Sequence, residues 1–311
     1  MARILSVNHL ALSLQEDARG QAAAMQERGS PVRVAAIRVG DSPVAQCLLD
    51  ERSRACQAAG VAFLCLTFPE DTPPGAVDAR LSDLSRDKTV TGVAVLRGMR
   101  ADFSYERAVR CLPVLKDVEA AHPVNLARVL VEPEPALLPP LCAALLAAFT
   151  THEIDLYDLS VLVLGPAREL GLPLTALLRA RHAAVMLASP ESPVWPRLLP
   201  LAEVVVAAGV ERGRIQGAMI SPGALLFDLG PPGPAAIAYW EGDPGGVQPT
   251  AGPGAFSADA MEKAGAVLPA GAILPLESAC FLQNAILCAR EAESSSLCVR
   301  KAEPTKRKGR K

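Results

Sequence analysis

The chain has 311 residues, of which 50% are hydrophobic and only 4% aromatic, and its formal net charge is −2. This length predicts about two domains with sizeable cores built on Leu, Val and Ala. A membrane protein is excluded because the richest apolar stretch, residues 137–149, contains two prolines and is too short to span a bilayer. The first residues lack the apolar core of a signal peptide, and Glu16 and Asp17 do not suit a mitochondrial transit peptide, so we expect a cytoplasmic protein.

Cysteine and histidine usage argues against disulfides and metal. The eight cysteines form no C-x-x-C pair and the four histidines are dispersed, which predicts reduced thiols and no metal site.

Charge is concentrated at the C-terminus. Residues 300–311 hold seven Lys or Arg and one acid, so they carry +6 and leave −8 on residues 1–299. Such a tail is able to contact nucleic acid or act as a nuclear address. Its composition favours the alternative, a solvated and disordered C-terminus over residues 291–311.

Hydrophobic periodicity predicts helices that alternate with apolar strands along the chain. Continuous apolar strands separated by helices favour parallel sheets between helical layers. The expected elements are helices over residues 11–28, 43–59, 76–86, 141–148 and 278–290, strands over 32–39, 61–66, 92–96, 183–188 and 204–208, and a strand, turn and helix over 160–173.

Residues 39–56 contain the most informative motif. Ser42 is a good N-cap and Pro43 suits the first helical position, so Leu48 and Arg52, four residues apart, share one helix face. The sequence Val-Gly-Asp-Ser-Pro-Val-Ala before this helix resembles the bifunctional methylenetetrahydrofolate dehydrogenase/cyclohydrolase family, in which V-G-D-x-P-A-S precedes a helix with Y-x-x-x-K. Leu48 stands at the tyrosine position and Arg52 at the lysine position.

The resemblance implies roles for these two positions. In the family the aromatic ring stacks on the folate and the lysine moves protons during cyclohydrolase chemistry. Leu48 can pack against a ring but has no hydroxyl, and Arg52 stays protonated at any working pH, so it cannot alternate between acid and base. Helix periodicity alone also fits an ordinary surface helix with a solvated Arg52.

Two further motifs belong to the same family domain. Residues 92–100 align with G-I-L-V-Q-L-P-L-P, where Leu96 replaces the glutamine that hydrogen-bonds the folate. Residues 116–125 read K-D-V-E-A-A-H-P-V-N, close to K-D-V-D-G-F-H-P-V-N, with Asp117 kept and Glu119 at the pterin-binding aspartate. The resemblance therefore implies a substrate site at Leu48, Leu96 and Asp117, with Glu119 gripping a pterin-like amine. A polar loop with an inert acid is the alternative.

The strand, turn and helix over residues 160–173 resemble V-V-I-G-R-S-x-x-V-G-x-P, the variant Rossmann turn of the family. Gly165 and Gly171 are kept, which implies a dinucleotide pyrophosphate at the helix N-terminus. Pro166 removes one backbone N–H, and Arg168 could compensate in part. In the alternative interpretation, both glycines serve only close packing of strand and helix.

Cofactor choice is read after the strand over residues 183–188. The family has C-H-S-x-T here, and Ser189 keeps the serine, which implies a cofactor contact. An acid at Glu191 would repel a ribose 2′-phosphate, so NAD is favoured over NADP if either binds.

Residues 270–277 take the place of the family's P-G-G-V-G-P-M-T, and only Gly271 and Pro275 are kept. The resemblance implies that Pro275 lies at the substrate site. The loop has gained an isoleucine and a leucine, which we expect to fill space that a folate or nicotinamide would use. The helix over 278–290 is expected to return to the first domain.

The resemblance covers residues 1–290 and implies an α/β two-domain fold. The family forms homodimers through its second domain, and the apolar strand over residues 204–208 permits the same here. The expected organisation is a tetrahydrofolate dehydrogenase/cyclohydrolase catalytic-like domain (1–140), a Rossmann-like NAD(P)-binding domain (141–275), a closing helix (276–290) and a basic tail (291–311).

Three functions are compatible with these residues. Residues that match the family motifs concentrate where the backbone turns, and residues that differ from them lie where the family contacts its ligands. This pattern favours a diverged member without cyclohydrolase activity that keeps the architecture for binding or assembly. The second is an active NAD(P)-dependent methylenetetrahydrofolate dehydrogenase, because hydride transfer needs folate and nicotinamide held face to face but no lysine shuttle. The third is a scaffold or nucleic-acid-associated protein that uses the basic tail.

Overall fold

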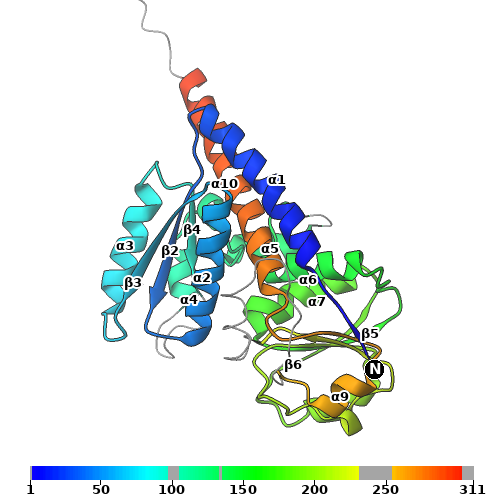
Figure 1. The fold of residues 1–311 in the computed structure, drawn as a ribbon. Coiled ribbons are helices and arrows are strands. Elements are labelled where there is room, and N and C mark those ends of the chain that lie inside the picture. Colours follow the sequence, from blue (N-terminus) through cyan, green and yellow to red (C-terminus); the bar gives the residue numbers. More distant parts are fainter. Residues whose placement is uncertain (1, 97–104, 133–134, 231–253, 303–311) are drawn as a thin grey trace, which may run out of the picture.

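The computed structural model describes residues 2–96, 105–132, 135–230 and 254–302, and shows two parallel sheets joined by long helices (Figure 1). Among the described residues, no helix combines the length and apolar character needed to cross a bilayer.

The first sheet has three strands in the order β3-β2-β4, and both pairs are parallel. Apolar side chains cover its two faces as separate clusters, one shared with α1 (Asn8–Glu27), α2 and α10 (Leu274–Ala302) and the other with α3 and α4. The elements are β2 (Arg33–Val39), α2 (Pro43–Ala58), β3 (Ala62–Phe68), α3 (Pro74–Arg86), β4 (Gly92–Val95) and α4 (Tyr105–Arg110).

The second sheet has six parallel strands in the order β1-β9-β8-β7-β5-β6. Its first strand, β1, comes from the start of the chain and pairs with β9 near the end. The strands are β1 (Arg3–Ile4), β5 (Ser160–Leu164), β6 (Ala184–Ala188), β7 (Val204–Ala207), β8 (Leu225–Asp228) and β9 (Ala266–Leu268), with helices α6 (Pro140–Thr151), α7 (Leu172–Arg179) and α9 (Ala258–Lys263). Five short helices, η1 (Val114–Lys116), η2 (Ala167–Gly171), η3 (Trp195–Arg197), η4 (Leu199–Leu201) and η5 (Gly217–Met219), complete the connections.

Strand β7 lies in the middle of this sheet. It pairs with β5 on one edge and β8 on the other, and its four side chains are fully buried. This strand therefore offers no free edge to a second subunit, and the predicted dimer through the second domain stays a prediction.

Helices α1 (Asn8–Glu27) and α10 (Leu274–Ala302) run side by side between the two sheets (Figure 1). Gln283 of α10 donates to Asp17 of α1 at 3.0 Å. Helix α10 is longer than the predicted helix over residues 278–290 and includes Pro275 in its first turn, where the missing N–H has no intrahelical partner to lose. The preceding loop is correspondingly short, and Ile273 is buried in the core of the second sheet.

Candidate functional site

A cavity of about 350 Å³ lies between the two sheets. Its walls come from α4 on the side of the first sheet, from α5 (Pro123–Val131), and from the first turns of α6 and α7 on the side of the second sheet. The lining residues are Tyr105, Glu106, Val109, Arg110, Glu119, Ala120, Ala121, Pro123, Leu126, Ala127, Leu130, Pro139, Pro140, Leu141, Leu172 and Pro173.

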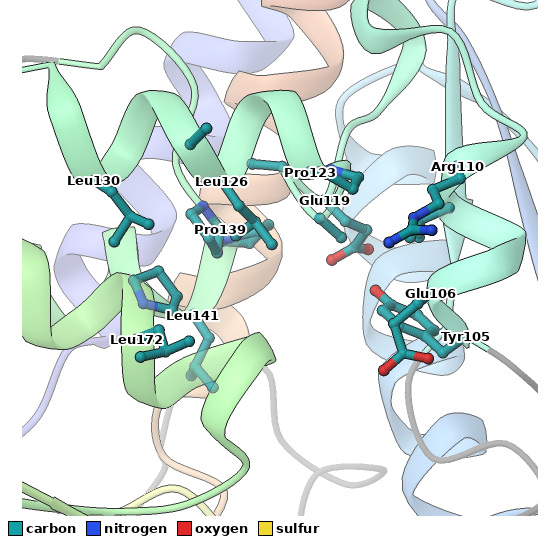
Figure 2. A pocket seen from close by; sticks show the side chains of 16 residues that line it. Tyr105, Glu106, Arg110, Glu119, Pro123, Leu126, Leu130, Pro139, Leu141 and Leu172 are labelled. Atoms are coloured by element: carbon teal, nitrogen blue, oxygen red, sulfur yellow. The ribbon is translucent and has the colours of Figure 1, made fainter.

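The cavity has a polar end and an apolar end (Figure 2). Glu119, Arg110 and Glu106 lie together at one end, while Leu130 and Leu172 lie at the other. Such a site offers charged groups for one part of a ligand and apolar walls for the remainder, which is the usual composition of a small-molecule site.

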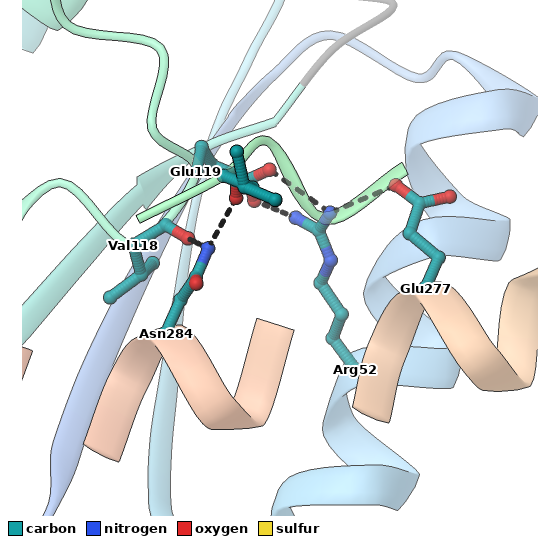
Figure 3. A network of polar contacts seen from close by, with 6 residues as sticks. Arg52, Val118, Glu119, Glu277 and Asn284 are labelled. Atoms are coloured by element: carbon teal, nitrogen blue, oxygen red, sulfur yellow. Dashed lines mark hydrogen bonds and ion pairs between the residues drawn. The ribbon is translucent and has the colours of Figure 1, made fainter. Parts of the chain in front are cut away.

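Arg52 lies beside this cavity in a buried polar network (Figure 3). Its guanidinium donates from both Nη atoms to the Glu119 carboxylate, with Nη2 to Oε2 at 3.1 Å, and from Nη2 to Glu277 Oε1 at 3.4 Å. Its Cζ lies 4.6 Å from the centre of the Phe281 ring. The residue is only 1% exposed, and Glu119 and Glu277 are 7% and 2% exposed.

The hypothesis of an ordinary surface helix with a solvated Arg52 is thus wrong. Arginine carries its charge in proteins, and this guanidinium is paired with two buried carboxylates. Arg52 and Leu48 do share the buried face of α2, as the spacing predicts.

Glu119 is placed by the turn between η1 and α5. The Asp117 carboxylate accepts hydrogen bonds from His122 N and from Asn125 Nδ2, each at 2.8 Å, and so fixes the start of α5. Burial raises the pKa of the Asp117 carboxyl. Ala120, next to Glu119, adopts φ of 52°, a conformation that favours glycine, and the family motif has glycine at this position.

The structure separates the other predicted substrate residues from the cavity. Leu48 and Leu96 are buried in the packing around the first sheet, Asp117 is fully buried in its turn, and Pro275 lies in the first turn of α10. None of these four lines the cavity, whereas Glu119 does. The cavity therefore unites one predicted residue with α4 and α5 side chains that the sequence did not single out.

The motifs did not point to four residues of this region, which are Tyr105, Glu106 and Arg110 at the polar end and Glu277 in the network. Glu277 had a detectable signal. It stands where the family motif has threonine, as the single acid within a run of apolar residues that opens a buried helix.

The turn between β5 and α7 has lost one backbone donor that a dinucleotide pyrophosphate could use, because Pro166 has no N–H. The N–H groups of Leu170 and Gly171 both donate to Pro166 O, at 3.2 and 3.0 Å, so they are used inside the turn. A Cβ at Gly171 would lie 2.6 Å from Leu187 Cδ1, so this glycine allows the turn to pack closely against the Leu187 side chain of β6. A Cβ on Gly165 would lie 3.0 Å from a side chain of the same turn. The side chain of Arg168 lies outside the described residues.

The residues predicted to select the cofactor lie after β6. Ser189 Oγ donates to the Glu191 carboxylate, and this hydrogen bond lowers the pKa of Glu191. Glu191 therefore keeps its negative charge at neutral pH.

Thiol chemistry is disfavoured in this region. Burial, reinforced by Glu51, raises the pKa of the Cys47 thiol to about 11, and burial raises that of Cys280 to about 12. Thiols with these pKa values are not nucleophilic at neutral pH. Within the described part of the chain, no group of three His, Cys, Asp or Glu residues is arranged to hold a metal ion.

Comparison with known proteins identifies the family. The model of the tetrahydrofolate dehydrogenase/cyclohydrolase catalytic domain matches residues 5–119, and that of the NAD(P)-binding domain matches residues 139–293. Bifunctional protein FolD of Afipia carboxidovorans is 31% identical over 284 residues, which cover 90% of this chain and 93% of that protein. FolD of Heliobacterium modesticaldum is 28% identical over 74% of this chain and 79% of its own length.

Solved structures show the same fold. FolD of Campylobacter jejuni superposes with a TM-score of 0.79 at 19% identity, over 94% of this chain and 99% of its own. The methylenetetrahydrofolate dehydrogenase-cyclohydrolase of Trypanosoma brucei, solved with NADP and an inhibitor, gives 0.81 at 20% identity, over 94% and 98%. The chain belongs to the tetrahydrofolate dehydrogenase/cyclohydrolase family, with its two-domain α/β fold.

Proposed function

We propose that this chain is a diverged protein of one-carbon folate metabolism that lacks cyclohydrolase activity. The observation that carries the proposal is the state of Arg52 at the lysine position, where its guanidinium is buried and bound by Glu119 and Glu277. A general acid and base must release and recover a proton near neutral pH. Arginine side chains do not do this in proteins.

The proposed ligand is a folate in the interdomain cavity. Glu119 supplies a carboxylate for N–H donors of a pterin-like ring, and the apolar walls of α5, α6 and α7 suit an aromatic body. The leucines and prolines at the apolar end of the cavity would exclude water from the bound ligand. Arg110, the basic residue among the described side chains at the polar end, is also an arginine and does not restore a lysine-type proton shuttle.

Calorimetric titration with tetrahydrofolate, paired with an assay of methenyltetrahydrofolate hydrolysis, tests the proposal. Saturable binding without hydrolysis above the buffer rate is the expected result. Hydrolysis well above buffer would refute the loss of cyclohydrolase activity, and absence of any folate binding would refute the ligand and leave a scaffold that retains only the fold.

A second candidate is an NAD(P)-dependent methylenetetrahydrofolate dehydrogenase. It is favoured by the position of Leu172 and Pro173, which line the cavity directly after the Gly165–Gly171 turn, so that a nucleotide held by this turn would border the folate site. The missing N–H of Pro166 in this turn argues against it. Calorimetric titration with NAD and NADP decides between the candidates. Binding of either dinucleotide, with NAD tighter because of Glu191, supports the dehydrogenase, and no binding of either excludes it.

Assembly and location follow from the family resemblance and remain proposals. We propose a cytoplasmic homodimer formed through the second domain, which sedimentation equilibrium tests. The basic tail was the basis of a nucleic-acid hypothesis, and its residues 303–311 lie outside the described part of the chain. Salt-sensitive binding to duplex DNA that disappears on deletion of residues 300–311 would support that hypothesis.

A further inference from the structure

Three separate elements meet at Arg52. The arginine comes from α2, Glu119 from the turn before α5, and Glu277 from the first turn of α10 (Figure 3). Glu277 lies 225 residues away from Arg52 in the sequence. The network therefore connects the helix that crosses between the two sheets with the wall of the cavity.

One face of α10 supplies every contact of this helix with the network. Glu277, Phe281 and Asn284 follow the i, i+4, i+7 spacing of a helical face. Glu277 accepts from the Arg52 guanidinium, and the Phe281 ring lies under it at 4.6 Å. An arginine side chain is long and flexible, so two contacts from a single rigid helix restrict its guanidinium to one orientation.

The same face holds the backbone beside Glu119. Asn284 Nδ2 donates to Val118 O at 2.9 Å and to Leu138 O at 2.8 Å. Helix α10 thus makes two contacts around Glu119. Asn284 holds the backbone of its turn, and Glu277 holds Arg52, the partner of the Glu119 side chain.

Glu119 is the residue at which network and cavity meet. Its carboxylate receives both Nη groups of Arg52, and it also lines the cavity. A carboxylate held by two parallel N–H donors has its plane fixed, because the bidentate geometry allows little rotation. The direction in which Glu119 is presented to a ligand is consequently set by where the guanidinium lies.

We infer that Glu277 is a positioning residue of the cavity, which orients the Arg52 guanidinium and, through it, the carboxylate that Glu119 presents to the ligand. This inference rests on the proposed function, in which Glu119 binds a folate. Glu277 is not among the residues that line the cavity, and its side chain lies on the opposite side of the Arg52 guanidinium from Glu119 (Figure 3). Its effect on binding must therefore pass through Glu119.

A double-mutant cycle with tetrahydrofolate as the calorimetric probe tests this. Glu277→Gln keeps the size of the side chain and removes the charge, and it is expected to weaken tetrahydrofolate binding about tenfold. Glu119→Gln removes the ligand contact and should weaken binding by more. In the Glu119→Gln background, the further change Glu277→Gln should alter the affinity by less than about twofold, because the group that it positions is gone.

Two further variants make the result specific. Glu291→Gln changes an exposed acid of the same helix and should leave the affinity unchanged. Glu277→Asp retains the charge with a shorter reach and should fall between the wild type and Glu277→Gln; it also replaces Glu277→Gln if that variant does not fold. Thermal unfolding of each variant verifies that the protein is folded at the titration temperature.

The outcomes separate the inference from the proposed function. The positioning role would be overturned by either of two results, both of which leave folate binding intact. In the first, the fold-loss of affinity in the double variant equals the product of the losses in Glu277→Gln and Glu119→Gln. In the second, the affinity of Glu277→Gln is unchanged. A wild-type protein that does not bind tetrahydrofolate would overturn both. Coupled losses together with an unaffected Glu291→Gln support the inference.

Discussion

Removal of the Arg52 guanidinium should expose the dependence of the fold on the buried network. In Arg52→Met the apolar stem is kept, and two carboxylates, those of Glu119 and Glu277, are left buried without their shared cation. Breaking a buried ion pair by removing one partner costs about 3–5 kcal/mol. We expect a loss in the upper part of that range, because two acids are affected and the contact with Phe281 is altered.

The companion variant removes all three charges. Arg52→Met combined with Glu119→Leu and Glu277→Leu leaves no uncompensated charge, and replacement of a whole buried ionic group by apolar residues is often neutral or stabilising by about 1–4 kcal/mol. The triple variant should therefore be clearly more stable than Arg52→Met, although it carries more substitutions.

Equilibrium unfolding in urea near neutral pH measures both variants, with the slope of the transition checked because a chain with two domains need not unfold in one step. In Arg52→Met, burial and mutual repulsion should raise the folded-state pKa of the two glutamates above the unfolded value near 4.3. Stability is then lost as pH rises through the raised pKa and regained as pH falls. A loss below about 1 kcal/mol, or a triple variant no more stable than the single, would refute the reasoning.

Three further predictions use the same region. Burial raises the pKa of the Asp117 carboxyl, so the stability of the wild type should fall as pH rises above about 4. Asp117→Asn removes the titrating group, and this fall should be absent from the variant. Identical pH profiles of unfolding for the two proteins would contradict this. Ala120→Gly should stabilise the protein by about 0.5–1 kcal/mol by relieving the left-handed backbone, whereas Ala121→Gly should not, as measured by urea unfolding. Arg52→Lys should not by itself restore hydrolysis of methenyltetrahydrofolate, because two carboxylates hold the ammonium in its charged form; turnover above buffer would show otherwise.

The sequence predicted the fold well where hydrophobic periodicity is strong. The strands that became β2, β4, β6 and β7, and the helix that became α2, were placed within one or two residues, because each is a continuous or periodic apolar run with a clear cap or turn beside it. The two-residue strand β1 was missed, since its hydrogen-bonding partner lies at the other end of the chain and two residues carry no periodic signal.

The candidate site was predicted only in part. Motif comparison identified Glu119 and Arg52, but it gave no information on the side chains that surround them, because contacts between residues far apart depend on how α10 crosses the sheets. Glu277 is the clearest example: its significance depends on a guanidinium in another domain. The same limit applies to Leu96. The motif comparison placed this residue at the substrate site, whereas in the fold its side chain is buried in the core.

The most direct test of the central claim is the rate of methenyltetrahydrofolate hydrolysis by the purified protein, measured beside a buffer blank and under conditions where calorimetry establishes folate binding. The two rates should be equal, because the position of the proton shuttle holds an arginine, which does not release its proton. Saturable hydrolysis well above the blank would contradict it.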